Sequence, residues 1–553
     1  MPRLRCCVQD EMKQFGRQVK TKQGIIQGLR LVDDGNCQID AFLGIPFAKP
    51  PIGPLRFKKP ELPEPWEGVK KTIKFGPSPL QYDLSWEKLW KRVNKNEDCL
   101  YLNVFSPAWS PSDDQKNGFA VMVFIHGGGF LFDFASRYGD INICNTLCRC
   151  DVIVVTIEYR LGLLGFFCTG DEACPGNIGL WDQVMALRWV KENICAFCGD
   201  PERITVFGHS AGGVCADFLS LSPKSRNLFQ QVIVMSGNAE CEWAISETER
   251  IVGVCKRFAE SVGWKKKGKG PEYHEEMLNY LRTLPAKVFK RRFFNHWINE
   301  SATSIILSPV IDGDFLPKSI EELRTEAPIK NCMVGTCKYE SLLFAAISST
   351  PLTLPGFDKI LNAYISPKKY VKYEELRKKV KNYYLNNIDS NNKLAVAHAC
   401  EDLSSNLFVT NGTAKYAEKM MALGHKVYLY SFDHFNPKSY GILSFILPFK
   451  GATHCTDLNY IFGLNIFLSP FKYNKSDEYV KIVASKLWTN FAKFGNPNVA
   501  DNTSNCECFK WLPVMSSPSC YLSIDTDNLQ MKEGYYYHQT EFWKNFRNDN
   551  ATN

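Results

Sequence analysis

Residues 204–216, ITVFGHSAGGVCA, place one serine between glycines at the end of an apolar run. A serine hydroxyl is a poor nucleophile at neutral pH, so it needs a neighbouring base and a rigid, exposed position. A Gly-x-Ser-x-Gly turn between a strand and a helix provides that position. The strand-like ITVF before the turn and the small residues AGGVCADFL after it predict that Ser210 is a nucleophile rather than part of a structural turn.

A second glycine-rich segment, HGGGF at residues 126–130, follows another strand-like run and precedes the serine turn in the chain. Glycine lets backbone N–H groups approach a ligand closely. Such a loop can supply an oxyanion hole together with the N–H group of the residue after the nucleophile, which is Ala211. Each donor contributes roughly 3 kcal/mol to the transition state of acyl transfer.

A general base and an acid should follow in the order serine, acid, histidine. The chain has nine histidines. His209 is adjacent to the serine, so we expect its side chain to point away from the hydroxyl. His434 and His454 are both suitable by position, and His454 lies in the small, loop-like GATHCTDLNYIFG. Glu340 follows the strand-like NCMVGT, where the carboxyl end of a strand places it on the reacting face of a sheet.

Short apolar runs alternate with longer helix-like stretches along the chain, and fully apolar runs of this length are typical of strands covered on both faces. These runs are residues 121–125, 152–159, 204–207, 231–237, 331–336 and 426–432. Residues 180–194 carry apolar side chains near helical spacing and predict a crossover helix. The sequence therefore predicts one α/β domain with a central, mostly parallel sheet and large helical insertions at about 240–300 and 340–425.

Composition is that of an ordinary globular protein, with 45% hydrophobic and 22% charged residues in 553. A net charge of +8 is small for this length and does not call for a nucleic-acid or anionic-membrane partner. Charged residues interrupt the N-terminal stretch, so we expect no secretory signal, and no apolar run is long enough for a transmembrane segment. We expect a cytoplasmic protein.

The 21 cysteines are an odd number spread over the whole chain. Without a signal, free thiols in a reducing compartment are expected. Cys6 and Cys7 follow two arginines and could be lipidated or simply free. The close pairs at 144/148, 195/198 and 506/508 lack a second pair of ligands at zinc spacing. We therefore expect no metal and no cofactor.

Several ordered blocks resemble the type-B carboxylesterase and cholinesterase family of the α/β-hydrolase fold, over about residues 18–545. Besides the serine segment FCGDPERITVFGHSAGG, these blocks are AFLGIPFAKPPIGPLRFKKPE, EDCLYLNVFSP, GNIGLWDQVMALRWVKENI, SPVIDGDFLP and LWTNFAKFGNPN. The resemblance implies an α/β-hydrolase domain at 18–545, an N-terminal extension at 1–17 and a C-terminal tail at 546–553.

The resemblance also implies roles for individual residues. Ser210 matches the nucleophile, Glu340 the acid and His454 the base. Gly128, Gly129 and Ala211 match the oxyanion donors. The acid of the family often lies in Asp-Glu-Gly, whereas this chain has Tyr-Glu-Ser, with the glutamate kept.

Three departures from the family are informative. Pro79 occupies the position of the cysteine that usually pairs with the cysteine of Asp-Cys-Leu, so Cys99 is expected to be unpaired. His209 replaces the glutamate that usually precedes the serine. Trp86 and Trp90 lie in the stretch where cholinesterases carry a choline-binding tryptophan, but here no disulfide closes that loop.

The neighbourhood of the site is predicted from the same resemblance. His209, Ser236 and Asp457 are expected to form a network beside the triad. The segment TSII before SPVIDG lacks bulky aromatic residues and predicts a roomy acyl pocket that includes Thr303 and Ile305.

The sequence thus predicts a serine carboxylesterase that acts on uncharged, small to medium esters through an acyl-enzyme, with a small-molecule ester as its partner. The alternatives within the family are a cholinesterase or a lipase-like hydrolase. A non-catalytic adhesion protein is a third alternative, although the three triad residues are all present.

Overall fold

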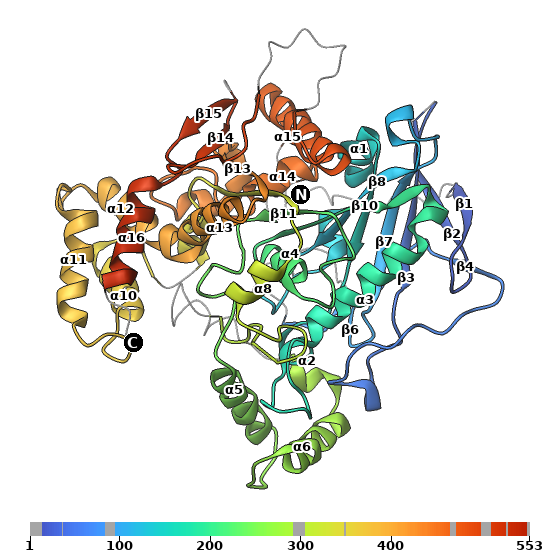
Figure 1. Ribbon diagram of the computed structural model, residues 1–553, viewed down its shortest axis with the longest axis horizontal. Coiled ribbons are helices and arrows are strands. Elements are labelled where there is room, and N and C mark those ends of the chain that lie inside the picture. The colour runs from blue at the N-terminus through green and yellow to red at the C-terminus, as the bar shows by residue number, and fades with distance from the viewer. Residues whose placement is uncertain are drawn as a thin grey trace, which may run out of the picture.

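The structure is a computed structural model that describes residues 14–35, 37–82, 94–290, 305–347, 350–464, 472–498, 510–526 and 529–549. One 13-stranded sheet forms its centre (Figure 1). Its strands are β1 Phe15–Lys20, β2 Ile25–Asp34, β3 Cys37–Pro46, β4 Val69–Lys71, β7 Tyr101–Pro107, β8 Phe119–Ile125, β9 Val152–Ile157, β10 Gly199–His209, β11 Gln231–Met235, β12 Asn331–Cys337, β13 Lys426–Phe432, β14 Cys520–Ile524 and β15 Gln530–Glu533. A second, two-stranded sheet joins β5 Ser78–Pro79 to β6 Lys95–Asn96.

The middle of the large sheet is parallel. Strands β9, β8, β10, β11, β12, β13 and β14 lie side by side in this order, and each pairs in parallel with the next. The edges are antiparallel, with β1, β2, β3 and β7 on one side and β15 on the other. All six predicted strands are present, and the predicted mostly parallel centre is confirmed.

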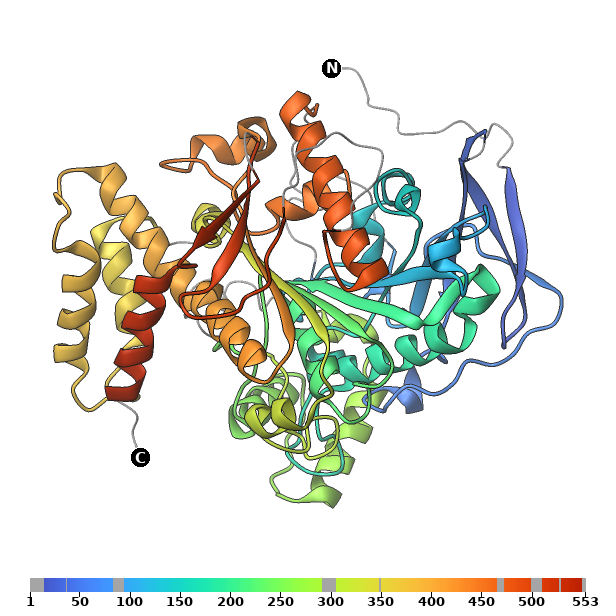
Figure 2. The ribbon, with the colours of Figure 1, turned by 45° about the horizontal axis from the view of Figure 1, so that its top comes forward.

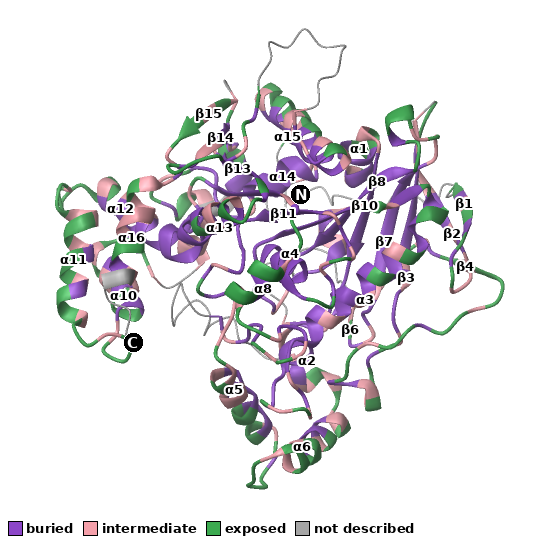
Figure 3. Cartoon of the chain, viewed as in Figure 1, coloured by how far each residue is buried: buried purple, intermediate pink, exposed green. Residues whose placement is uncertain are grey.

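Both faces of the central strands are covered by helices, as Figures 1 and 3 show. One face packs against α3 Ile178–Asn193 and α4 Ala211–Leu221, and the other against α14 Thr456–Ile461 and α15 Lys475–Phe494. Side chains alternate between the faces, because successive residues of a strand point in opposite directions. In β8, Val121 and Val123 belong to the first core and Met122 and Phe124 to the second. The predicted crossover helix is α3.

In Figures 1 and 2, the helices of the first insertion lie below the sheet, and most helices of the second lie to the left of it. The first contains α5 Thr248–Ser261 and α6 Pro271–Thr283. The second contains α9 Leu342–Ile347, α10 Leu354–Tyr364, α11 Tyr373–Leu385, α12 Lys393–Ser405, a π-helical turn η8 Asn406–Thr410, and α13 Asn411–Ala422. Helices α10, α11 and α12 share a separate hydrophobic cluster with the C-terminal helix α16 Tyr537–Asp549.

The first and last described elements extend across the predicted domain divisions. Strand β1 begins at Phe15 and α16 continues to Asp549, so the divisions at 17/18 and 545/546 fall inside these elements. Phe546 is fully buried and its ring lies 5.2 Å from that of Trp543. The last turns of α16 are therefore part of the core of the helical cluster.

The cysteines within the described ranges all have free sulfurs, and Cys99, expected to be unpaired, is among them. None of the helices in these ranges combines the length and the apolar character needed to cross a membrane. Cys6, Cys7, Trp86, Trp90 and Thr303 lie outside the described residues.

Replacing the buried aromatic residue at the end of α16 tests its place in the core. We expect Phe546→Ala to destabilise the cluster of α10, α11, α12 and α16 by about 3–5 kcal/mol, because it removes a large apolar side chain and leaves a cavity. Hydrogen exchange of the amides in α10 and α12 would measure the loss as faster local opening. The control Val371→Ala, at a side chain that is 90% exposed, should leave these rates unchanged. Equal rates in the two variants would contradict the prediction.

Candidate active site

Ser210 stands at a sharp turn between β10 and α4. Its backbone has φ +59° and ψ −126°, a conformation that residues with a side chain rarely adopt and that costs on the order of 1–3 kcal/mol. The turn is so tight that a Cβ atom on Gly208 would lie 2.1 Å from the carbonyl oxygen of Gly212. Because the glycines around Ser210 have no side chains, the chain can make this tight turn. The turn places the serine at the carboxyl end of the parallel strands.

The glycine-rich loop passes directly beside this turn. A Cβ atom on Gly127 would lie 3.1 Å from the Cβ of Ser210. Gly128 and Gly129 have φ values of +91° and +60°, which favour glycine. Within the described ranges, the amides of these two glycines donate no hydrogen bond to the protein. Ala211 is the first residue of α4, where an amide has no partner inside the helix. Three N–H groups are therefore available near the serine.

Buried polar contacts anchor the residues on either side of the glycine loop. Asp133 accepts a hydrogen bond of 2.6 Å from the hydroxyl of Tyr138, and its backbone N–H donates to the side chain of Gln81. His126 is fully buried, and its Nε2 lies 3.4 Å from Glu158. These contacts make the loop rigid, which is what preorganised donors require.

Glu340 and His454 meet in the interior, 114 residues apart in the chain. Nδ1 of His454 lies 2.6 Å from Oε2 of Glu340. The other carboxylate oxygen accepts hydrogen bonds of 2.6 Å from the Ser236 hydroxyl and 2.7 Å from the Cys337 amide. The backbone N–H of Tyr339 also donates to Ala452, which ties the Glu340 loop to the His454 loop. Since Nδ1 of His454 bonds to Glu340, its Nε2 is available for a partner other than Glu340.

Burial acts on both members of this pair. It lowers the pKa of His454, because an imidazolium ion would lose its hydration. Burial also raises the pKa of Glu340, against the opposing effect of hydrogen bonds from Ser236 and Cys337. The resting site therefore favours a neutral imidazole, which is the form that accepts a proton.

Among the described residues, no hydrogen bond joins the Ser210 hydroxyl to His454, and such bonds are often long before substrate binds.

Two phenylalanine rings form an apolar wall against His454. The ring of Phe344 in α9 lies 5.1 Å from the imidazole, and that of Phe408 in η8 lies 5.3 Å away. Trp243 stacks on Phe408 at 5.5 Å and donates to its carbonyl group. The sequence did not predict this apolar wall. Its residues come from both insertions, and no short motif joins them.

His209, Ser236 and Asp457 do not form the single network that was predicted. Ser236 follows β11 and donates to Glu340 instead. Nε2 of His209 lies 3.8 Å from Asp457 and has no hydrogen-bond partner. Burial, followed by the proximity of His454, lowers the pKa of His209 well below its ordinary value. Burial raises the pKa of Asp457 to about 7. The residue before Ser210 is thus neutral.

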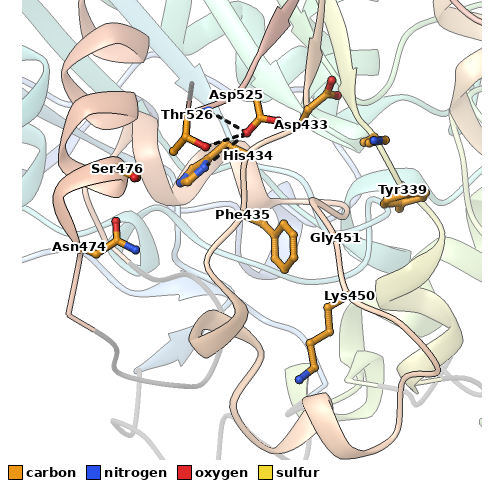
Figure 4. A pocket seen from close by; sticks show the side chains of 11 residues that line it. Tyr339, Asp433, His434, Phe435, Lys450, Gly451, Asn474, Ser476, Asp525 and Thr526 are labelled. Atoms are coloured by element: carbon orange, nitrogen blue, oxygen red, sulfur yellow. Dashed lines mark hydrogen bonds and ion pairs between the residues drawn. The ribbon is translucent and has the colours of Figure 1, made fainter. Parts of the chain in front are cut away.

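His434, the other histidine suited by position, belongs to a different place. Its Nε2 lies 2.9 Å from Asp477. It lines a polar cavity of about 430 Å³ together with Tyr339, Lys450 and Asp525 (Figure 4). Ser210, Glu340 and His454 are not among the residues that line this cavity. The structure therefore separates the two histidines that position in the chain could not distinguish.

Glu401 is a supporting residue that sequence reasoning missed. It lies in α12 with 1% of its surface exposed and accepts hydrogen bonds from the amide and hydroxyl of Ser341, both at 3.2 Å. Ser405, one turn further along the helix, donates to the same oxygen. Glu401 thereby fixes the residue next to Glu340. Its neighbours at helical spacing are Ala397, His398, Ser404 and Ser405, so the local sequence does not mark it as buried.

Of the two residues predicted for the acyl pocket, only Ile305 is among the described residues. Ile305 is buried in the core on the α3 and α4 side of the sheet, and its carbonyl group accepts a hydrogen bond of 2.8 Å from Arg250. No measured contact joins Ile305 to Ser210 within the described residues. The assignment of Thr303 and Ile305 to an acyl pocket stays a prediction.

A strand–turn–helix with a serine at its apex, a glycine loop beside it and a buried Glu–His pair define a hydrolase of the α/β class. A family model described as the carboxylesterase family matches residues 16–543, and the chain belongs to this family. It therefore has the α/β-hydrolase fold and is a serine carboxylic ester hydrolase, whose substrates are small-molecule esters.

Named relatives cover nearly the whole chain. An esterase of Caenorhabditis elegans, cest-33, is 36% identical over 92% of this chain and 91% of its own length. A medium-chain fatty acyl-CoA hydrolase precursor of Anas platyrhynchos is 32% identical, covering 95% of this chain and 91% of its own. A cholinesterase of Mus musculus is 30% identical, covering 96% and 86%.

The buried carboxyl group of Glu401 predicts a pH dependence of stability. Burial raises its pKa to about 8, well above the value of about 4.3 in an unfolded chain. The folded state therefore binds more protons between these two values, and stability falls as pH rises through this window, by at most about 1.4 kcal/mol per pH unit for one group. Glu401→Gln, which imitates the protonated acid, should reduce the fall.

The measurement is the thermal unfolding midpoint at pH 5, 6.5 and 8. Glu375→Gln is the control, because the side chain of Glu375 is 74% exposed. Parallel pH profiles for wild type and Glu401→Gln would show that Glu401 does not titrate in this way.

Proposed function

We propose that this enzyme hydrolyses uncharged, small to medium carboxylic esters through Ser210, His454 and Glu340, by way of a covalent acyl-enzyme. The observation that carries the proposal is the 2.6 Å contact between Glu340 and His454 beside a serine held at a strained turn. A nucleophile, a neutral base and an acceptor that orients the base are the parts that acyl transfer needs.

In the first step, Ser210 Oγ attacks the carbonyl carbon of the ester while Nε2 of His454 takes the hydroxyl proton. Glu340 holds the imidazole in the tautomer with the proton on Nδ1 and stabilises the positive charge that forms. The N–H groups of Gly128, Gly129 and Ala211 stabilise the negative oxygen of the tetrahedral intermediate. His454 then protonates the leaving alcohol.

In the second step, His454 removes a proton from water as that water attacks the acyl carbon. The intermediate collapses, the carboxylic acid leaves and the proton returns to Ser210. The chemistry is complete with these groups and calls for no cofactor. Because the strained turn is fixed by packing, the serine is in position before the substrate arrives.

The surroundings of His454 support an uncharged substrate. Phe344 and Phe408 make an apolar surface beside the base. His209 stands where the family usually has a glutamate, and burial keeps it neutral. A cationic substrate would find no negative charge at this position. A choline ester is therefore disfavoured relative to a butyrate ester or a longer uncharged ester.

Replacing the nucleophile tests the chemistry. Ser210→Ala should reduce kcat on p-nitrophenyl butyrate by at least about 10⁴-fold, because the residual rate then comes from the oxyanion donors alone. Ser220→Ala, in the helix that follows Ser210, is the matched control and should stay active, since among the described residues its hydroxyl donates to Asp217 alone. A fluorophosphonate probe should label wild type and the control, but not Ser210→Ala. Retained activity in Ser210→Ala would overturn the assignment.

Replacing the neighbour of the nucleophile tests substrate choice. His209→Glu introduces a carboxylate, so we expect the ratio of kcat/KM for acetylthiocholine to that for the butyrate ester to rise by about tenfold or more. His209→Gln, a neutral side chain of similar size, should leave the ratio near that of wild type. Turnover of the butyrate ester should persist in both variants. A complete loss of turnover, or an equal ratio in the two variants, would contradict this role.

A further inference from the structure

Three side chains that can bind a metal converge at the predicted base. His209 ends β10, and His454 and Cys455 lie in the loop before α14. One ligand atom from each residue lies within 4.8 Å of the other two. Sγ of Cys455 is 3.8 Å from Nδ1 of His209, and the rings of the two histidines are 4.5 Å apart. Both histidines are at least 96% buried.

The separation of Cys455 from His209 suits a small tetrahedral ion. Zinc binds sulfur at about 2.3 Å and nitrogen at about 2.0–2.1 Å, so its sulfur and nitrogen ligands are about 3.6 Å apart. The measured distance of 3.8 Å between Cys455 and His209 is already close to this value. Thiolate and imidazole together favour zinc and similar borderline or soft ions over magnesium or calcium.

The outer nitrogen of each histidine faces a carboxyl group. Nδ1 of His454 bonds to Glu340, which leaves Nε2 as its free ligand atom. Nδ1 of His209 faces Cys455, and its buried Nε2 lies 3.8 Å from Asp457 without a hydrogen-bond partner. Histidine ligands of metals usually donate their second N–H to a carboxylate, which orients the ring and makes it a better ligand. His454 has such a bond to Glu340, and Asp457 is the carboxyl group nearest to the second nitrogen of His209.

We propose that His209, His454 and Cys455 form an inhibitory site for zinc or a similar divalent ion. The ion displaces the thiol proton of Cys455 and takes up the lone pair of His454 Nε2. With three protein ligands, the fourth position stays open to water. The inhibition, but not the binding, rests on the proposed role of His454 as the base, because an imidazole bound to a metal cannot accept the proton of Ser210.

Binding is tested first in a protein that cannot turn over. Ser210→Ala keeps all three ligands, and titration with Co²⁺ should give the near-ultraviolet absorption of a thiolate–cobalt bond, which Zn²⁺ then removes. Adding Cys455→Ser or His209→Gln should weaken binding by more than about 100-fold, since even the loss of a supporting contact costs 10–100-fold. Adding Cys198→Ser, at an exposed cysteine, is the matched control and should leave binding unchanged. Equal binding in all these proteins would overturn the site.

Inhibition is tested with active protein in buffers of fixed free Zn²⁺. Each variant is compared with its own metal-free rate on p-nitrophenyl butyrate, so that a change in turnover does not count. Cys455→Ser and His209→Gln should need more than about 100-fold more zinc for half inhibition, whereas Cys198→Ser should behave as wild type. Binding without inhibition would overturn the inhibitory role. A wild type that binds cobalt through Cys455 but hydrolyses no ester would support the metal site and overturn the proposed function.

Discussion

The hydrogen bond between Glu340 and His454 is the interaction on which the site depends. A fully buried carboxyl group is costly unless donors surround it, and here the donors come from three places. Ser236 follows β11, the amide of Cys337 ends β12, and His454 lies on the loop before α14. Met235 pairs with Gly335 in the parallel sheet, so the register of β11 against β12 decides whether the hydroxyl reaches the carboxylate.

The same burial sets the chemical character of the pocket. It disfavours charge on His209 and His454 and leaves the carboxyl groups of Glu340 and Asp457 with raised pKa values. A low local dielectric strengthens a well-aimed N–H group toward an oxyanion and makes an unpaired charge expensive. Burial and well-aimed N–H groups together therefore favour negative charge that develops on an oxyanion.

The sequence predicted the features whose residues are close together in the chain. The strand, turn and helix around Ser210 fall within one short segment, as does the loop at Gly128, and apolar runs marked the central strands. Contacts between segments that are far apart in the chain were harder to predict from the sequence. Glu401 supports Glu340 through Ser341, and Phe408 packs on His454, because the helical insertion folds back onto the sheet. The burial of Phe546 near the end of α16 likewise arises from tertiary packing, which no local pattern in the sequence indicates.

The proximity of His209 to Cys455 is the clearest case of this limit. Spacing rules recognise metal ligands that come from one local motif, and by those rules the cysteine pairs in this chain gave no zinc site. The proposed ligands His209 and Cys455 are 246 residues apart and lie close together because β10 and the His454 loop end at the same edge of the sheet. Under the proposed function, a neutral histidine at position 209 lacks the charge that would attract cationic substrates. In the proposed metal site, the same imidazole joins the base and the thiol, so one residue accounts for both the preference against choline esters and the affinity for a metal.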